Sequence, residues 1–161
     1  MRTVILASHG HLASGMKNTV EMILGEQEAL KAFDAYTTPE CNVHDTLEAM
    51  LRQADGECVI VTDVLGGSVN KEAVVFAAQP GVRVITGMNL TLVATLLTEE
   101  ELPLDELVRT GIAEAQASIQ QPELDGSIRL RDNLFHGLLE KFPVQFLVVA
   151  MLLKKSLWNA E

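Results

Sequence analysis

Short apolar runs rich in β-branched residues alternate with helical patterns over about the first 100 residues, and this alternation constrains the fold more than any other feature. Each connection between runs is long enough to contain a helix and too long for a hairpin. This favours parallel strands joined by right-handed crossovers. We therefore predict an α/β fold, an open, mostly parallel four-stranded sheet flanked by helices. The predicted strands are 3–7, 30–35, 58–63 and 82–86, and the predicted helices are 13–24, 43–53, 68–79 and 90–97.

Turn-forming residues lie at the ends of these elements. Gly25 stands where a helix commonly ends, and Asn42 precedes a helical pattern as a good N-cap. Pro80-Gly81 predicts a turn between the third helix and the fourth strand. The local signals therefore agree with the alternation of elements.

A further helix is predicted over residues 104–120, because it follows Pro103 and Pro122 cannot easily continue it. We place a domain boundary there. Residues 1–121 are expected to form the main domain, and residues 122–161 a tail containing a strand and a helix.

Composition excludes several partners and environments. The chain has 161 residues with 22 acidic and 12 basic side chains, and its net charge of −10 argues against nucleic acid or an anionic membrane surface. Its longest apolar stretch, 142–153, contains Pro143 and is shorter than the roughly 20 residues of a membrane-spanning helix. Strand-like residues begin too early for a secretory signal, so we expect a cytoplasmic protein. Cys41 and Cys58 lack metal-like spacing and are expected to be free thiols.

Two loops are the best candidates for chemistry. In an open parallel sheet, ligands gather at the carboxyl ends of the strands, where residues 8–11 and 62–68 lie. If the first and third strands are neighbours, His9 and Asp63 will lie within side-chain reach of each other. We favour a functional role for His9, because a purely structural role at this position has no requirement for imidazole.

The chemistry of this pair suits phosphoryl transfer. A carboxylate on one imidazole nitrogen fixes the tautomer and leaves the other nitrogen as a nucleophile. Gly66 and Gly67 would let backbone N–H groups approach an anion, and Ser68 is expected to cap the next helix while offering a hydroxyl. Taken alone, the Gly-Gly-Ser segment is more often only a turn and a cap.

Other polar residues near these loops have simpler interpretations. Ser8 is expected to be a hydrogen-bonding loop residue, since no nucleophile-elbow motif surrounds it. His11 is expected to be an exposed loop histidine, and His44 a solvated residue on a charged helix face.

Three segments, 4–10, 61–70 and 85–90, resemble the IIA component of the mannose/fructose/sorbose family of the bacterial phosphoenolpyruvate-dependent sugar phosphotransferase system. The resemblance implies a phosphotransferase in which His9 accepts a phosphoryl group from the phosphocarrier protein HPr and passes it to a IIB component. It further implies that Asp63 orients His9, and that Ser68 with Gly66 and Gly67 receives the phosphoryl oxygens. No metal or other cofactor is implied. The sequence does not reveal which sugar is transported.

The resemblance also implies a homodimer in which a C-terminal strand is exchanged, and residues 127–130 are strand-like. One departure is that many members read Gly-Gly-Ser-Pro-Phe-Asn where this chain reads Gly-Gly-Ser-Val-Asn. The end of this loop is therefore expected to differ, and with it the partner surface.

The tail carries a weaker likeness. Residues 129–137 resemble the opening of the family's IIB domain around its phosphorylated histidine, with His136 at the matching position and Asn133 in place of an arginine. A complete IIB domain cannot fit in the remaining residues. A truncated IIB remnant would explain the motif, but we favour a packing helix in which His136 is incidental.

Two alternative functions stay open. One is a IIA-like subunit that donates phosphoryl groups to dihydroxyacetone kinase. The other is a receiver-like regulatory domain phosphorylated on Asp63, although receivers hold Mg²⁺ with acidic residues after the first strand, where this chain has Ser-His-Gly-His. A role in regulation instead of transport is equally compatible with the sequence.

Overall fold

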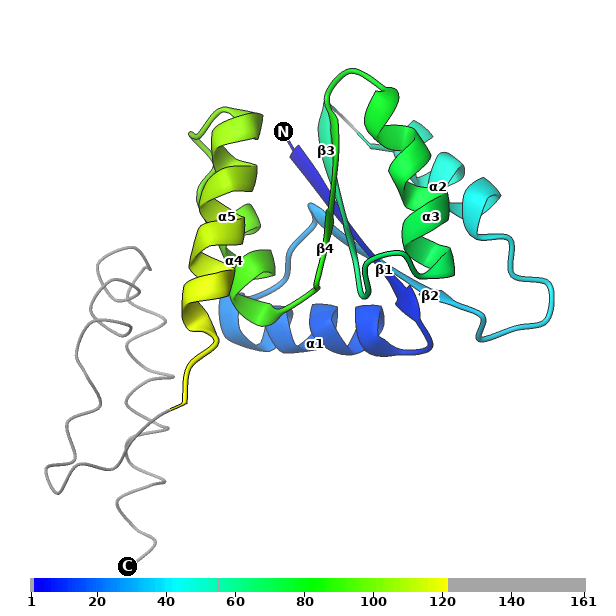
Figure 1. Ribbon diagram of the computed structural model, residues 1–161, viewed down its shortest axis with the longest axis horizontal. Coiled ribbons are helices and arrows are strands. Elements are labelled where there is room, and N and C mark those ends of the chain that lie inside the picture. Colours follow the sequence, from blue (N-terminus) through cyan, green and yellow to red (C-terminus); the bar gives the residue numbers. More distant parts are fainter. Residues whose placement is uncertain (1, 55, 122–161) are drawn as a thin grey trace, which may run out of the picture. The chain divides into compact units, whose positions relative to one another are not determined.

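The computed structural model describes residues 2–54 and 56–121 (Figure 1). The tail at 122–161, with the expected strand at 127–130 and His136, lies outside the described residues. The strands are β1 (Arg2–His9), β2 (Leu30–Ala35), β3 (Glu57–Thr62) and β4 (Val82–Thr86). The helices are α1 (Leu12–Leu24), α2 (Val43–Arg52), α3 (Ser68–Val74), the 3₁₀ helix η1 (Val75–Ala78), α4 (Leu90–Thr98) and α5 (Leu104–Ser118).

The four strands form one parallel sheet in the order β2-β1-β3-β4. The predicted open α/β fold is thus confirmed. β1 lies inside the sheet, with Ala7 opposite Phe33 of β2 on one side and opposite Thr62 of β3 on the other. The condition set by the sequence, that the first and third strands be neighbours, is met, so the loops that follow them lie side by side.

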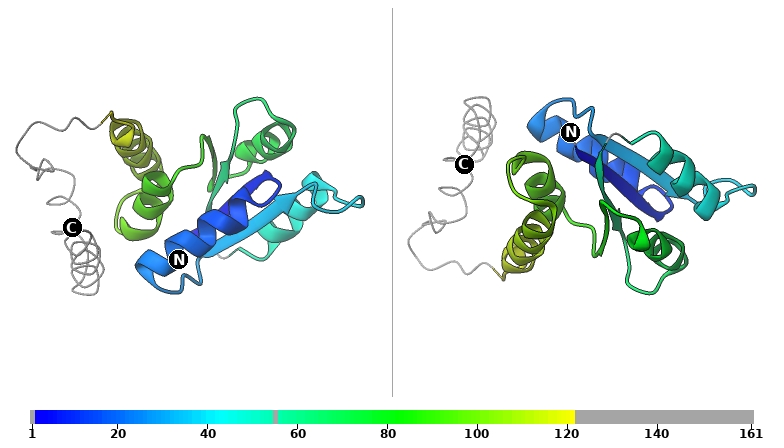
Figure 2. Two further views of the ribbon diagram at one scale, coloured as in Figure 1. Left: turned by 90° about the horizontal axis from the view of Figure 1, so that it is seen from below. Right: turned by 90° about the horizontal axis from the view of Figure 1, so that it is seen from above.

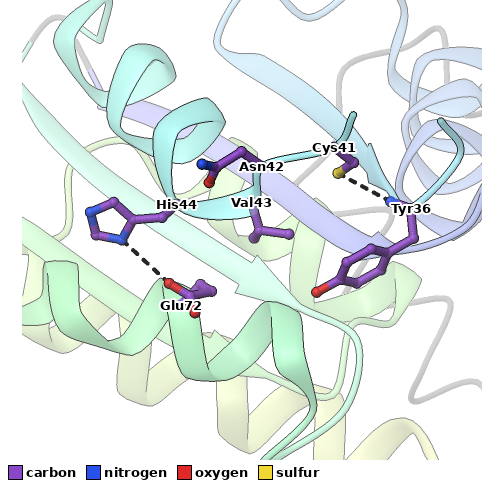
Figure 3. A pocket seen from close by; sticks show the side chains of 6 residues that line it. All are labelled: Tyr36, Cys41, Asn42, Val43, His44 and Glu72. Carbon is purple, nitrogen blue, oxygen red and sulfur yellow. Dashed lines mark hydrogen bonds and ion pairs between the residues drawn. The ribbon is translucent and has the colours of Figure 1, made fainter. Parts of the chain in front are cut away.

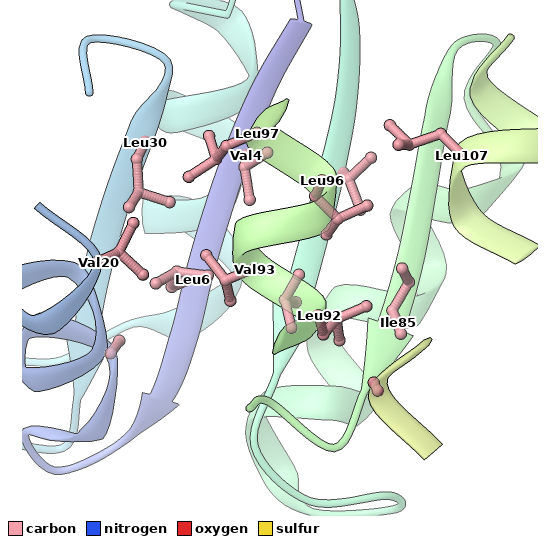
Figure 4. Packing of buried hydrophobic residues seen from close by; sticks show 14 of the residues in the cluster. Val4, Leu6, Val20, Leu30, Ile85, Leu92, Val93, Leu96, Leu97 and Leu107 are labelled. Atoms are coloured by element: carbon pink, nitrogen blue, oxygen red, sulfur yellow. The ribbon is translucent and has the colours of Figure 1, made fainter. Parts of the chain in front are cut away.

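Helices cover both faces of the sheet, and the strands alternate their side chains between two apolar clusters (Figure 2). In β1, Val4 and Leu6 face α1, α4 and α5, whereas Ile5 and Ala7 face α2 and α3. Figure 4 shows the first cluster, in which leucines of α4 pack over the central strands. Because both faces are covered, the central strands are apolar over most of their length, as is typical of parallel sheets.

The capping residues behave as the sequence predicts. The Asn42 side chain accepts a hydrogen bond from the backbone N–H of Asp45 over 3.1 Å at the start of α2. Gly25 follows α1 with a φ of 81°, a conformation that side chains disfavour.

Three predicted helices agree with the structure to within one residue at each end, and the other two differ more. The helix predicted over 68–79 divides into α3 and η1 and ends at Ala78. Gln79 is extended, with ψ at 137°, because the ring of the following Pro80 clashes with a helical residue before it. The helix predicted over 104–120 ends at Ser118, since Ile119 is already extended. None of the helices in the described part of the chain is long and apolar enough to cross a membrane.

We expect Leu107→Ala to lower the free energy of unfolding by about 2–5 kcal/mol, because Leu107 of α5 is fully buried and truncation leaves a cavity. Ile119→Ala, at the end of the same helix where the side chain is 79% exposed, serves as the control and should change the free energy by less than about 0.5 kcal/mol. Urea unfolding measures both. Equal effects would show that Leu107 does not pack in the apolar cluster that α5 shares with α4.

Candidate active site

The two strands in the centre of the sheet place His9 against Asp63. His9 is the last residue of β1, and Asp63 directly follows β3. His9 Nδ1 lies 2.7 Å from Asp63 Oδ2, and the backbone N–H of His9 donates to the same oxygen over 2.9 Å. The expected proximity of these two side chains is therefore observed, and the carboxylate holds both the ring and the backbone of His9.

The hydrogen bonds to Asp63 keep its carboxyl group ionised. Partial burial alone would raise the pKa of Asp63, but the hydrogen bonds from the His9 backbone and ring and from the Val64 N–H outweigh it and lower this pKa. An ionised carboxylate beside Nδ1 accepts the proton of that nitrogen, so we infer that the neutral imidazole carries its hydrogen on Nδ1. The nucleophilic lone pair then lies on Nε2.

Ser68 faces the other nitrogen of the ring. Its Oγ lies 3.0 Å from His9 Nε2. The expectation that Ser68 caps the helix is wrong: Gly67 is the N-cap of α3, and Ser68 is the first helical residue. The side chain of Ser68 is directed to the imidazole instead, where its hydroxyl can donate to the Nε2 lone pair.

The glycine loop lies directly against the imidazole. Gly66 has a φ of 74°, which disfavours any residue with a side chain. A Cβ on Gly67 would lie 2.8 Å from Val64 Cγ1 and 3.1 Å from His9 Cε1. The position therefore requires glycine, and the missing side chain lets the backbone reach the edge of the ring.

A series of hydrogen bonds between buried polar side chains, which the sequence did not reveal, holds the glycine loop against the sheet. Asn70 Oδ1 accepts the N–H of Gly66 over 2.9 Å, and Asn70 Nδ2 donates to Thr62 Oγ1 over 3.0 Å. Thr62 Oγ1 in turn donates to the carbonyl of Ile85 in β4 over 3.3 Å. Asn70 and Thr62 are both buried, so the conformation of the loop is tied to the sheet core.

A second histidine–aspartate pair lies at the same edge of the sheet. His11 Nδ1 contacts Asp34 Oδ2 at 2.9 Å, and Asp34 also accepts hydrogen bonds from the N–H and the Oγ of Ser14 over 2.9 and 2.6 Å. The His11 side chain is 81% exposed, as expected, but its partner in β2 was not anticipated. His11, the N-cap of α1, makes no capping hydrogen bond with its side chain. Asp34 accepts the hydrogen bonds from the first turn instead and thus holds α1 to β2.

The remaining candidates have structural roles. Ser8 is fully buried in β1, not in a loop, and its Oγ accepts the N–H of Ala13 over 2.7 Å. His44 is 45% exposed, as expected for a solvated residue, but its Nδ1 also lies 3.4 Å from Glu72 and its ring stacks on Phe76 at 4.9 Å, contacts that were not anticipated. Both cysteines are free thiols, and burial raises the pKa of Cys58 to about 12.

Comparison with known proteins identifies the family. The model for the PTS system fructose IIA component, where PTS stands for the phosphotransferase system, matches residues 3–110, well over half of the 161-residue chain. The chain belongs to this IIA family. The resemblance indicated by the three sequence motifs is therefore confirmed, and the chain is a component of the sugar phosphotransferase system with a role in phosphoryl transfer.

Solved structures of other phosphotransferase-system proteins agree with this assignment. A protein of Klebsiella pneumoniae assigned to the phosphoenolpyruvate-dependent sugar phosphotransferase system is 35% identical, with a TM-score of 0.70 over 74% of this chain and 90% of that chain. A PTS IIA protein associated with the fucose utilization operon of Streptococcus pneumoniae is 28% identical, with a TM-score of 0.61 over 74% and 92%. The mannose/sorbose-specific IIA subunit of Enterococcus faecalis, 24% identical with a TM-score of 0.67 over 77% and 96%, supports the fold.

We expect the free energy of unfolding of Asp34→Asn to fall less than that of the parent chain as the pH is lowered. Burial favours a higher pKa for Asp34, but the hydrogen bonds from Ser14 and His11 outweigh it and lower this pKa in the folded IIA domain. A lowered folded-state pKa stabilises the fold above the ordinary value of 3.8 and loses that stabilisation as the pH falls through the lower folded value. Urea unfolding between pH 7 and pH 3 measures the effect. An unchanged slope for Asp34→Asn would contradict it.

Proposed function

We propose that this IIA chain is a phosphocarrier that accepts a phosphoryl group from phosphorylated HPr on His9 and passes it to a IIB component during sugar uptake. The observation that carries the proposal is that both ring nitrogens of the His9 imidazole have defined neighbours. Nδ1 is held by Asp63 at 2.7 Å, and Nε2 faces Ser68 at the end of the glycine loop. This arrangement leaves one nitrogen free to react and places hydrogen-bond donors beside it.

The transfer step is a displacement at phosphorus. The Ser68 hydroxyl first turns away from the Nε2 lone pair, which then attacks the phosphorus carried by the donor's histidine. The new bond joins His9 Nε2 to phosphorus, and the bond between phosphorus and the donor nitrogen breaks with its electron pair going to the donor. The proton on Nδ1 stays in the hydrogen bond to Asp63. Transfer to the IIB component is the same step in reverse order.

Two groups would stabilise the charges that this step creates. The imidazole becomes positive as Nε2 bonds to phosphorus, and the Asp63 carboxylate lies against it. The Ser68 hydroxyl would donate to a phosphoryl oxygen. The N–H groups of Gly66 and Gly67 already donate to Asn70 Oδ1 and to the carbonyl of Val64, so these glycines would contribute by leaving room for the phosphoryl group beside the ring. Catalysis of this kind consists of positioning and electrostatic stabilisation.

The surface around His9 suits a protein partner. Of nine exposed large apolar side chains in the described part of the chain, five lie just beyond the carboxyl ends of the strands. Apolar groups gathered around a polar centre are typical of a protein interaction surface. The five are Leu12, Tyr36, Val64, Leu65 and Leu90.

The alternatives predict different acceptors or a different adduct. A subunit serving dihydroxyacetone kinase would use the same histidine, so transfer assays with a IIB component and with the kinase subunit distinguish the two. A receiver would carry the phosphoryl group on Asp63, but Asp63 Oδ1 and Oδ2 are both occupied by hydrogen bonds from His9 and Val64. Phosphohistidine survives alkali and is lost in acid, whereas an acyl phosphate is lost in both.

We expect His9→Ala to abolish labelling by phosphorylated HPr, because the variant lacks the acceptor nitrogen. His11→Ala and His44→Ala are matched controls that remove the neighbouring histidines and should retain label. Enzyme I, HPr and labelled phosphoenolpyruvate supply the donor, and mass spectrometry maps the adduct. Stoichiometric label on His9→Ala, or label on His136, would overturn this mechanism.

We expect Asp63→Asn to slow transfer by up to ~10⁴-fold without moving the label, because the amide neither fixes the tautomer nor stabilises the imidazolium. Ser68→Ala should slow transfer only a few-fold to about tenfold, since one neutral hydrogen bond contributes about 0.5–1.5 kcal/mol. Rapid-quench kinetics order the two variants. A larger loss for Ser68→Ala than for Asp63→Asn would contradict the assigned roles, and label on Asp63 would indicate a receiver.

A further inference from the structure

Tyr36 has an unfavourable backbone conformation beside the site. It directly follows β2, and its φ of 61° makes it the one non-glycine residue in the described part of the chain with a positive φ. This left-handed region brings Cβ close to the carbonyl oxygen and is adopted readily only by glycine and, less often, by asparagine or aspartate. A tyrosine at this position therefore requires a reason.

Core packing does not supply that reason. Tyr36 is 50% exposed, and its outer side lines an open groove of about 260 Å³ together with residues of the β2–α2 connection and Glu72 of α3 (Figure 3). The turn does not supply it either. The Tyr36 backbone N–H donates to Cys41 Sγ over 3.2 Å, a contact that glycine or asparagine could make with less strain.

The ring of Tyr36 reaches the imidazole of His9. The two ring centroids are 5.5 Å apart and the planes are inclined by 31°, so the rings lie closer to parallel than to perpendicular. The other sides of the imidazole are occupied by Asp63 at Nδ1, Ser68 at Nε2 and Gly67 near Cε1. Tyr36 approaches from the β2 side, because His9 is paired with Ala35 in the sheet.

We propose that Tyr36 is a positioning residue for His9, whose ring face stabilises the positive charge on the imidazole when Nε2 bonds to phosphorus. The inference rests on the proposed function. A cation within about 6 Å of an aromatic centroid is attracted by the ring, and at a partly exposed site this shifts an equilibrium by roughly two- to fivefold. The unfavourable φ is then the consequence of directing an aromatic side chain from the end of β2 onto the adjacent histidine.

The equilibrium of phosphoryl exchange with HPr tests this role. Phosphorylated HPr is mixed with the parent chain, with Tyr36→Phe, which keeps the ring, and with Tyr36→Leu, which is apolar without a ring. Intact mass spectrometry gives the four free species at equilibrium. Because that equilibrium constant depends only on the free proteins, a change in partner docking does not alter it.

We expect Tyr36→Leu to shift the equilibrium roughly two- to fivefold toward phosphorylated HPr, and Tyr36→Phe to match the parent. If Tyr36→Leu equals the parent while the parent accepts the phosphoryl group, the role of Tyr36 is wrong and the proposed function stands. If the parent accepts no phosphoryl group, both the role of Tyr36 and the proposed function are wrong.

Two measurements on the unphosphorylated protein test the geometry by itself. In NMR spectra, Tyr36→Leu should shift the carbon-bound ring protons of His9, because the ring current of Tyr36 is lost, while Tyr36→Phe should largely preserve them. Tyr36→Asn should unfold at a higher temperature than the parent, since asparagine tolerates the left-handed conformation. Unchanged His9 resonances in Tyr36→Leu, or an unfolding temperature of Tyr36→Asn at or below that of the parent, would overturn the proposal.

Discussion

The pairing of β1 with β3 is the interaction on which the candidate site depends. It places the end of β1 next to the end of β3, so that His9 and Asp63 meet although 54 residues separate them in sequence. β1 is held on both edges by neighbouring strands and on both faces by apolar clusters, and Val4 to Ser8 are at most 1% exposed. The imidazole is thus mounted on one of the most buried segments of the molecule, which limits its movement without a dedicated clamp.

The two histidine–aspartate pairs show what distinguishes a candidate nucleophile from a structural contact. Gly10 turns the chain with a φ of 55° between His9 and His11, and each histidine meets the aspartate of a different neighbouring strand. Both aspartates have lowered pKa values, so the ionisation of the carboxyl group does not distinguish the two pairs. The difference lies at the second ring nitrogen. His9 Nε2 faces Ser68 and the glycine loop, whereas the His11 side chain is 81% exposed.

Much of this arrangement could be predicted from the sequence, and the exceptions have a common cause. Periodicity and turn residues are local, so the strands, the caps at Gly25 and Asn42 and the candidate loops could be located. The contacts of Tyr36 with His9 and of Asp34 with Ser14 join elements that are distant in sequence, and no local pattern specifies such partners. The wrong expectation for Ser68 has the same origin, because its side chain contacts His9 of another element instead of its own helix end.

The buried link from Gly66 through Asn70 to Thr62 bears on the direction of the chemistry. A loop fixed by groups beneath it needs no ligand to take its shape, so little reorganisation accompanies each transfer. Under the proposed function one site would run two half-reactions, and a rigid loop would present the same shape to an arriving and to a departing phosphoryl group. The direction of flow would then be left to the relative phosphorylation of the donor and acceptor proteins.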